Sequence, residues 1–172
     1  MTALADGIGY FAVFLGLFNY VSVRRRPIFV VKGITDALWI INFTLYGLKT
    51  AALIQCINLV RTVVFSCREK KTWAAHSALL VVFLLCALAS PLLTWAGPVS
   101  LLPAVGSVLC CVGYYMRRPL ALKCVVLLGM FFWMGYSILS ANFPALLGNL
   151  FGVVSLVIGI VRELPKKRKK MI

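Results

Sequence analysis

The sequence predicts an all-α integral membrane protein with seven transmembrane helices. Hydrophobic residues make up 62% of the 172-residue chain, and only four residues are acidic. Mean hydropathy is +0.99. Apolar stretches of about 17 to 24 residues, the length that crosses a bilayer, recur along the whole chain. A soluble domain of this size would show polar faces at helical or strand period, so the lipid bilayer is the expected solvent.

Helix-breaking residues and charges delimit the expected helices. The first apolar stretch, 4–23, has no positive region before it and is followed by three arginines, so we interpret it as a span and not as a signal peptide. Proline begins or precedes several later helices because it lacks a backbone N–H and suits a first helical turn. The expected helices cover residues 4–23, 28–48, 51–66, 72–96, 99–116, 120–140 and 143–161.

Basic clusters predict the orientation. They fall on alternate connections, and the opposite connections carry only Lys49; the clusters lie at 24–26, 68–71, 117–118 and 166–170. Cytoplasmic loops are enriched in Lys and Arg, so the chain is expected to begin in the periplasm or outside and to end in the cytoplasm. The basic tail could also bind anionic lipid, although we interpret it as a topology anchor. Nucleic acid is not an expected partner, because no aromatic residues are interleaved with the charges.

The two halves of the chain repeat short motifs. Arg-Arg-Pro at 25–27 recurs at 117–119, an offset of 92 residues, and Ala-Leu-Ile at 52–54 recurs as Ala-Leu-Leu at 145–147, an offset of 93 residues. Chance similarity between apolar helices is the alternative explanation. Parallel repeats of this kind are a transporter architecture with the substrate at the interface. The repeat predicts a 3+1+3 arrangement of two parallel triple-helix bundles joined by a linker helix: a first bundle at 1–71, the linker at 72–97, a second bundle at 98–164 and a basic cytoplasmic tail at 165–172.

Two ionisable residues fall inside expected spans. Asp36 and Arg61 lie on neighbouring antiparallel helices, about 12 Å and about 8 Å from the cytoplasmic end at 1.5 Å per residue. A buried charge in a bilayer needs a partner or water. The sequence therefore predicts an Asp36–Arg61 ion pair, which would either hold the two helices together or act as a cytoplasmic gate.

Uncharged polar residues suggest a substrate site. Asn58 and Asn149 lie 91 residues apart, at equivalent positions of the repeats, and Asn42 and Trp133 each precede one of them by sixteen residues. Carboxamides offer hydrogen bonds to a hydroxyl-rich or heterocyclic solute without the desolvation cost of a charge. The alternatives are that the asparagines join helices to one another and that Trp133 is ordinary packing.

Catalytic and metal-binding patterns are absent from the sequence. It contains no Gly-rich phosphate loop, no paired carboxylates and no Cys/His constellation, and the six cysteines lack metal-ligand spacing. We therefore expect no enzyme activity, no cofactor and no metal.

The sequence resembles the bacterial inner-membrane YgjV family through NLVRT at 58–62, LLPAVG at 101–106 and the region from Lys123 and Cys124 to Trp133. That family in turn is similar to the MtN3, SWEET and PQ-loop group, which implies two triple-helix bundles, a linker helix and transport of small solutes. The resemblance implies that Asn58, Asn149 and Trp133 line a pocket. Asn42 stands where that group has a tryptophan, and the sequence lacks the Pro-Gln dipeptide of the group.

Two functions are compatible with these observations. The expected function is an inner-membrane facilitator that passes a small polar solute, such as a sugar, nucleoside or vitamin, by alternating access between the bundles. The alternative is a non-transporting scaffold or partner subunit, which would have a dry, apolar centre. A homo-oligomer is compatible with either function.

Overall fold

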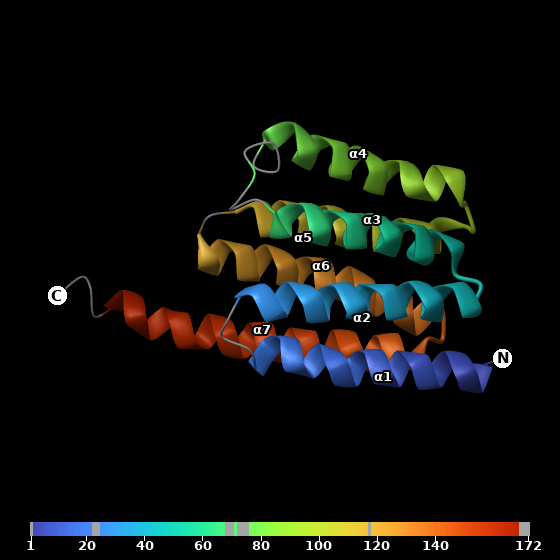
Figure 1. The fold of residues 1–172 in the computed structure, drawn as a ribbon, viewed down its shortest axis with the longest axis horizontal. Coiled ribbons are helices and arrows are strands. Elements are labelled where there is room, and N and C mark those ends of the chain that lie inside the picture. The colour runs from blue at the N-terminus through green and yellow to red at the C-terminus, as the bar shows by residue number, and fades with distance from the viewer. Residues whose placement is uncertain (1, 22–24, 68–70, 72–75, 117, 169–172) are drawn as a thin grey trace.

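In the residues that the computed structural model describes, 2–21, 25–67, 71, 76–116 and 118–168, the chain folds into seven α-helices and one short 3₁₀ helix, with no strand. The helices lie side by side along a common direction, with the two termini at opposite ends (Figure 1). They are α1 (Thr2–Val21), α2 (Arg25–Leu45), α3 (Lys49–Ser66), α4 (Ser77–Leu93), η2 (Pro98–Ser100), α5 (Leu101–Tyr115), α6 (Pro119–Leu139) and α7 (Phe143–Arg168).

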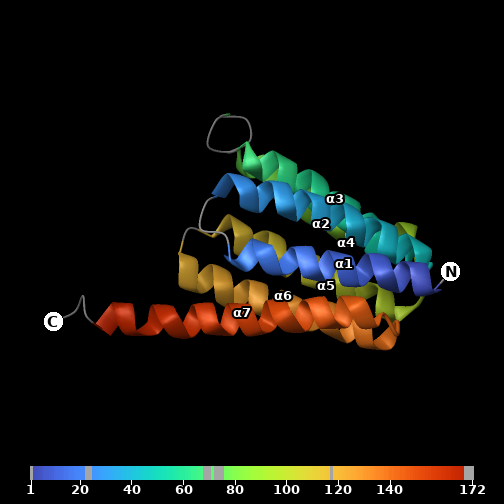
Figure 2. The same ribbon diagram turned by 60° about the horizontal axis from the view of Figure 1, so that its bottom comes forward.

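The expected helices are all present, because apolar stretches between charges and helix breakers leave few other boundaries. The largest difference is at α7, which continues to Arg168 and not only to 161, so the first part of the expected tail is helical. Figure 2 shows α7 extending past the other helices. Several residues of the basic clusters, at 24, 68, 70, 117, 169 and 170, lie outside the described residues.

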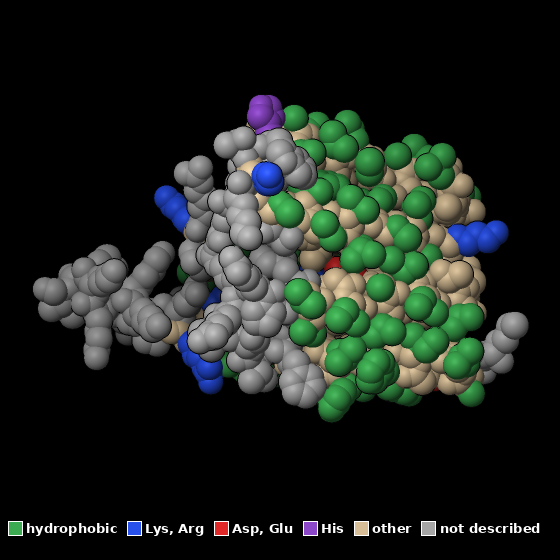
Figure 3. Space-filling model, viewed as in Figure 1, with side chains coloured by type: hydrophobic (Ala, Val, Ile, Leu, Met, Phe, Trp, Pro, Cys, Tyr) green, Lys and Arg blue, Asp and Glu red, His purple; other side chains and the backbone are tan. Residues whose placement is uncertain are grey.

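The outer surface of the helices is apolar. Within the part of the chain that the structure describes, three stretches are long and apolar enough to cross a bilayer, namely Pro98–Tyr115, Leu120–Leu139 and Phe143–Arg162, and Ala3–Leu17 and Ser77–Leu93 are shorter apolar helices. Hydrophobic side chains are spread over the described part of the face seen in Figure 3, to the right of the atoms drawn in grey. Such a surface matches lipid and not water, so the fold is that of a helical membrane protein.

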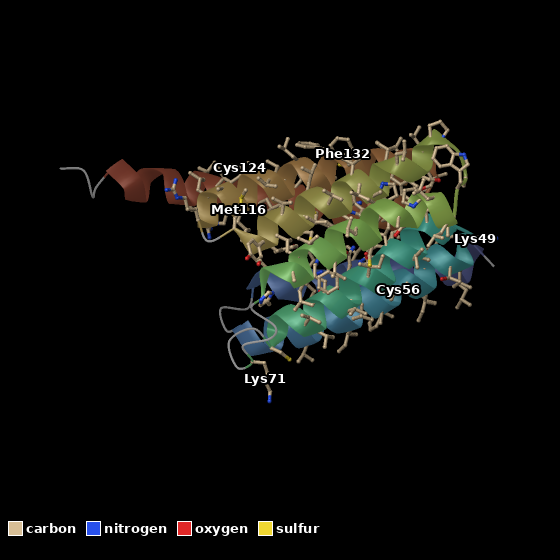
Figure 4. All side chains as sticks on the ribbon, turned by 90° about the horizontal axis from the view of Figure 1, so that it is seen from above. Lys49, Cys56, Lys71, Met116, Cys124 and Phe132 are labelled. Carbon is tan, nitrogen blue, oxygen red and sulfur yellow. The ribbon has the colours of Figure 1, made fainter. Side chains whose placement is uncertain are left out.

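The helices of each half pack in chain order. α2 packs against both α1 and α3, and α6 packs against both α5 and α7. The halves meet where α1 contacts α7 and where α3 contacts α5, while α4 lies across α3 and α5 (Figures 1 and 4). The interior that could hold a site is therefore bounded by α2 and α3 from one half and by α5 and α6 from the other.

The turns after α2 and after α6 have the same geometry. Gly47 ends α2 with φ 71°, and the N–H of Leu48 donates to the carbonyl of Phe43 at 2.8 Å. Ala141 ends α6 with φ 51°, and the N–H of Asn142 donates to the carbonyl of Ser137 at 3.0 Å. Both are Schellman caps, in which a left-handed residue lets the chain reverse at once into the next helix.

The bundle has two ends, which differ in the helix ends that lie there. The N-terminal end is where α1 starts and where α2 joins α3, and the C-terminal end is where α7 finishes; Lys49 and Lys71 lie at these two ends in Figure 4. The hydrophobic core lies toward the N-terminal end, since its members come from the last turns of α2 and α6 and the first turns of α3, α5 and α7. They are Phe43, Ala51, Ile54, Ala104, Trp133, Tyr136 and Ala145.

Candidate functional site

A network of polar side chains surrounds Asp36 in the middle of α2. Asp36 is 2% exposed, and its two carboxylate oxygens accept hydrogen bonds from three residues. Lys32 Nζ lies 3.0 and 3.2 Å from Oδ1 and Oδ2, Gln55 Nε2 lies 2.8 Å from Oδ1, and Thr62 Oγ1 lies 3.1 Å from Oδ2. Lys32 is one helical turn before Asp36, so the ion pair forms within α2.

The network continues across the contact between the halves. Asn58 Nδ2 donates to Gln55 Oε1 at 3.2 Å, and Ser107 Oγ on α5 donates to Asn58 Oδ1 at 3.0 Å. In this series of hydrogen bonds each residue donates to the next, from Ser107 to Asn58, from Asn58 to Gln55, and from Gln55 to Asp36. Gln55, Asn58 and Ser107 are all buried, so the bonds form away from water, where hydrogen bonds polarise one another.

Among the described residues, no ion pair joins Asp36 to Arg61, the pair that the sequence predicts. Asp36 pairs with Lys32, one turn away on its own helix. Arg61, which is 4% exposed, turns toward α5 instead, where its guanidinium lies 5.3 Å from the centre of the Tyr114 ring. Lys32 pairs with Asp36 because residues four apart on one helix are neighbours and need no tertiary contact, whereas Arg61 faces the second half of the chain.

An aromatic stack closes the N-terminal side of the network. Phe43 of α2 stacks on Trp133 of α6 with centroids 5.9 Å apart, Trp39 stacks on Phe43 at 5.8 Å, and Tyr136 meets the Trp133 ring edge-on at 6.3 Å. Trp133 is fixed by the close approach of α5: a Cβ on Gly106 would lie 2.7 Å from its ring. The stack joins the two halves with apolar contacts, as offset aromatic pairs do.

A second polar contact lies at the N-terminal end. Asn42 Nδ2 donates to the carbonyl of Ala5 on α1 at 2.8 Å, and Asn142 Nδ2 donates to Asn42 Oδ1 at 2.8 Å. Asn142 Oδ1 also accepts from the N–H of Ala145, which caps α7. Both asparagines are fully buried, and with these bonds they tie α1, α2 and α7 together.

Just outside the end of α2, Tyr46 donates a hydrogen bond to Asp6 of α1. Burial, together with that hydrogen bond, raises the pKa of Tyr46 to about 12. The phenol therefore stays protonated and keeps the start of α1 against the α2–α3 turn.

The four predicted pocket residues fall in different places. Asn58 is in the network described above, whereas Asn149 donates to Ser137 Oγ of α6 at 3.2 Å, within its own half. Trp133 lies in the aromatic stack and Asn42 in the N-terminal contact. The carboxamides of Asn58 and Asn149 therefore bond to different helices, and among the described residues no hydrogen bond joins them.

Sequence reasoning missed Gln55, Thr62 and Ser107, and it missed the role of Lys32. The spacing of Gln55, Asn58 and Thr62 by three and four residues places them on one face of α3, which was a readable signal. Ser107 had no comparable signal, because a lone serine in an apolar helix commonly bonds its own backbone.

Comparison with known families identifies the chain. The profile of Imp-YgjV, described as bacterial inner membrane protein, matches residues 3–167. The chain therefore belongs to this family of bacterial inner membrane proteins. Comparison of the chain with curated proteins and with solved structures gave no match.

Proposed function

We propose that this YgjV-family inner membrane protein is a facilitator, which passes a small polar solute across the membrane by alternating access between its two halves. The observation that carries the proposal is the buried polar network where the halves meet, centred on Asp36, Asn58 and Ser107. Polar and ionisable residues inside a membrane protein are costly, and they commonly mark a substrate or ion pathway.

Helix packing supports a 3+1+3 arrangement with seven spans. In two parallel bundles related by a two-fold axis, the first helix of each bundle meets the third helix of the other. The contacts of α1 with α7 and of α3 with α5 have this form. The matching caps at Gly47 and Ala141 agree with a repeat, and α4 has the place of a linker. The relation to SWEET and PQ-loop transporters is part of this proposal.

The proposed binding groups lie on the contact between α3 and α5. A rocking motion that separates these helices would break the bond between Ser107 and Asn58, leaving a hydroxyl and a carboxamide free to bind a solute. We propose the C-terminal end as cytoplasmic, and access from this end when the aromatic stack at Phe43 and Trp133 is closed. Opening of the other side would require that stack to part.

Asn149 and Trp133 have different proposed roles from those expected of pocket residues. Trp133 acts as a closure through its contact with Phe43, and Asn149 braces α7 against α6 through Ser137. Asn42 fixes α1 and α7 at the N-terminal end through Ala5 and Asn142.

A second candidate function, a non-transporting scaffold or partner subunit, is favoured by one observation. Phe43, Ile54 and Trp133 pack in a single cluster between the halves, as a dry centre requires. In this alternative the polar network only fixes helix register, as buried polar groups do in some helical assemblies.

Counterflow in proteoliposomes distinguishes the two functions. Labelled sugars, nucleosides, vitamins, amino acids and small organic acids are offered to the wild type, to Asn58→Ala, and to Val60→Ala. Val60 is on the same helix but faces outward, so its variant is the matched control. A facilitator shows exchange that Asn58→Ala reduces and Val60→Ala does not. A folded wild type that exchanges none of the panel supports the scaffold.

A further inference from the structure

Arg61 is a buried cation that has no carboxylate partner among the described residues. Its neighbours Val60 and Val63 are 54% and 56% exposed, so α3 turns its apolar side outward and Arg61 inward. The group that Arg61 meets on α5 is the Tyr114 ring, 5.3 Å from the guanidinium, and this ring supplies no full negative charge. A guanidinium has five N–H donors in a planar fork, and no hydrogen bond from Arg61 to an oxygen atom of another described residue is seen.

The other charges nearby do not balance Arg61. Lys32 and Asp36 pair on α2, and Arg61 on α3 lies against the Tyr114 ring of α5. Thr62, the residue after Arg61, donates to Asp36, so the three charged residues lie in one region where α2, α3 and α5 meet. Among the described residues, the cluster of Lys32, Asp36 and Arg61 carries two positive charges and one negative charge, a net charge of +1, and the side chain of Lys32 at its edge is 31% exposed.

Asp36 is not available to compensate Arg61. Its two oxygens already accept from Lys32, Gln55 and Thr62. An unbalanced charge in a low-dielectric interior is strongly unfavourable unless an anion joins it. The surplus thus points to an anionic ligand and not to a structural ion pair.

We propose that Arg61 binds the carboxylate of a solute that carries a single negative charge. This inference rests on the proposed function and narrows its substrate class. A carboxylate matches the planar fork of the guanidinium through two parallel hydrogen bonds and brings the local charge to zero. A phosphate monoester, with nearly two negative charges, would leave an unbalanced negative charge in the same place. Asn58 and Ser107 offer an amide and a hydroxyl to the uncharged part of the solute.

A lipid headgroup could supply an oxyanion as well, but the burial of Arg61 argues against it. Only 4% of Arg61 is exposed, and α5 covers its guanidinium. The aqueous phase is therefore the proposed source of the anion. The test separates the two sources by using vesicles of zwitterionic phosphatidylcholine with and without anionic phosphatidylglycerol.

The test compares acids with their own amides. Labelled acetate, lactate and benzoate, and acetamide, lactamide and benzamide, are measured in counterflow with the full-length protein in phosphatidylcholine vesicles. The same compounds and inorganic phosphate are tested for their effect on the unfolding temperature of the detergent-purified protein. We expect at least one acid to exceed its amide by about tenfold or more in exchange or in affinity.

Arg61→Gln and Arg61→Lys test the residue itself, and Lys49→Gln is the matched control. Lys49 is on the same helix but exposed at the N-terminal end, so its variant removes the same charge elsewhere. Arg61→Gln is expected to lose the preference for the acid, Arg61→Lys to keep part of it, and Lys49→Gln to keep all of it. The comparison of each acid with its amide uses the wild type, so it tests the carboxylate site even if Arg61→Gln does not fold.

The outcomes separate the inference from the function on which it rests. Equal responses to each acid and its amide, or an acid preference that survives in Arg61→Gln, would overturn the carboxylate site. A preference for inorganic phosphate, or a response only in vesicles with phosphatidylglycerol, would also overturn it. Exchange of neutral solutes without acid preference would leave the facilitator standing and remove only this inference. Acid-specific stabilisation without any exchange would support the site while contradicting transport.

Discussion

The two ends of the helix bundle hold the halves together by different means. Toward the N-terminal end, Phe43 and Trp133 stack between α2 and α6, and Asn42 and Asn142 satisfy each other with neutral hydrogen bonds. Toward the C-terminal end, the interior contains charges, and those of Arg61, Lys32 and Asp36 do not sum to zero. The first region has neutral, mutually bonded groups, whereas the second is the proposed site of an anionic ligand.

This difference separates closure from recognition. Neutral, fully bonded and well-packed contacts fix one arrangement of helices, because buried polar groups that are satisfied make a core more specific. A surplus charge destabilises the empty state and so favours a ligand that supplies the missing charge. The N-terminal region is thus suited to be the closed side of a pathway, and the polar network to be its site.

The largest expected loss of stability is in the aromatic stack. Trp133→Ala removes the ring that joins Phe43 to Tyr136 and should cost about 3–5 kcal/mol of stability, since a large buried aromatic leaves a cavity. Phe132→Ala is the control, because Phe132 is adjacent on α6 but more than one third exposed (Figure 4). Thermal unfolding in detergent measures both variants. Equal losses of stability in the two variants would mean that the aromatic stack does not hold the two halves together.

A somewhat smaller effect is expected in the polar network. Asp36→Asn removes the counter-charge of Lys32 and should destabilise the protein by about 3 kcal/mol, because it leaves an uncompensated charge in the interior. The double variant Lys32→Met, Asp36→Leu removes both charges and should recover much of that loss. Thermal unfolding of the two variants measures the coupling. A double variant that is less stable than Asp36→Asn would show that the bonds to Gln55 and Thr62, and not the ion pair, dominate the network.

Features of the fold that depend on local sequence could be predicted, whereas features that depend on tertiary contacts could not. Helix number and approximate ends depend on apolar length and on breakers such as Pro119, which are local features, and they were predicted well. The face that each helix turns inward could not be derived in the same way, because helices with apolar residues on every side show no stripe that fixes their rotation.

The candidate site shows the same limit at the level of single residues. Asp36, Arg61 and Asn58 were singled out because polar side chains in an apolar span are conspicuous. Their partners depend on helix rotation and on tertiary contacts, so Arg61 was paired with Asp36 although it turns to Tyr114. Asn58 and Asn149 are equivalent in the predicted repeat, but they have different partners, Gln55 and Ser107 for Asn58 and Ser137 for Asn149.

Two glycines of α1 sharpen the comparison at the N-terminal end. A Cβ on Gly9 would lie 2.5 Å from Pro144 and 2.7 Å from Asn42, whereas a Cβ on Gly7 meets nothing within 4 Å. Gly9→Ala should therefore cost about 2 kcal/mol through overpacking. Gly7→Ala should be neutral or stabilise the protein by up to about 1 kcal/mol through helix propensity. Unfolding temperatures that change equally in both variants would show that α1 does not pack tightly on α7 at this position.

The smallest expected effect concerns pH at the same end. Burial and the hydrogen bond to Asp6 raise the pKa of Tyr46 from 10.0 to about 12, so folding favours the protonated phenol. The stability that this adds is fully present below pH 10 and is lost as the pH rises through 12. Tyr46→Phe cannot ionise, so its unfolding temperature should fall less than that of the wild type over this interval. Parallel curves for the two proteins would mean that Tyr46 ionises as freely in the folded protein as in the unfolded chain, and that its bond to Asp6 contributes little to the N-terminal contact.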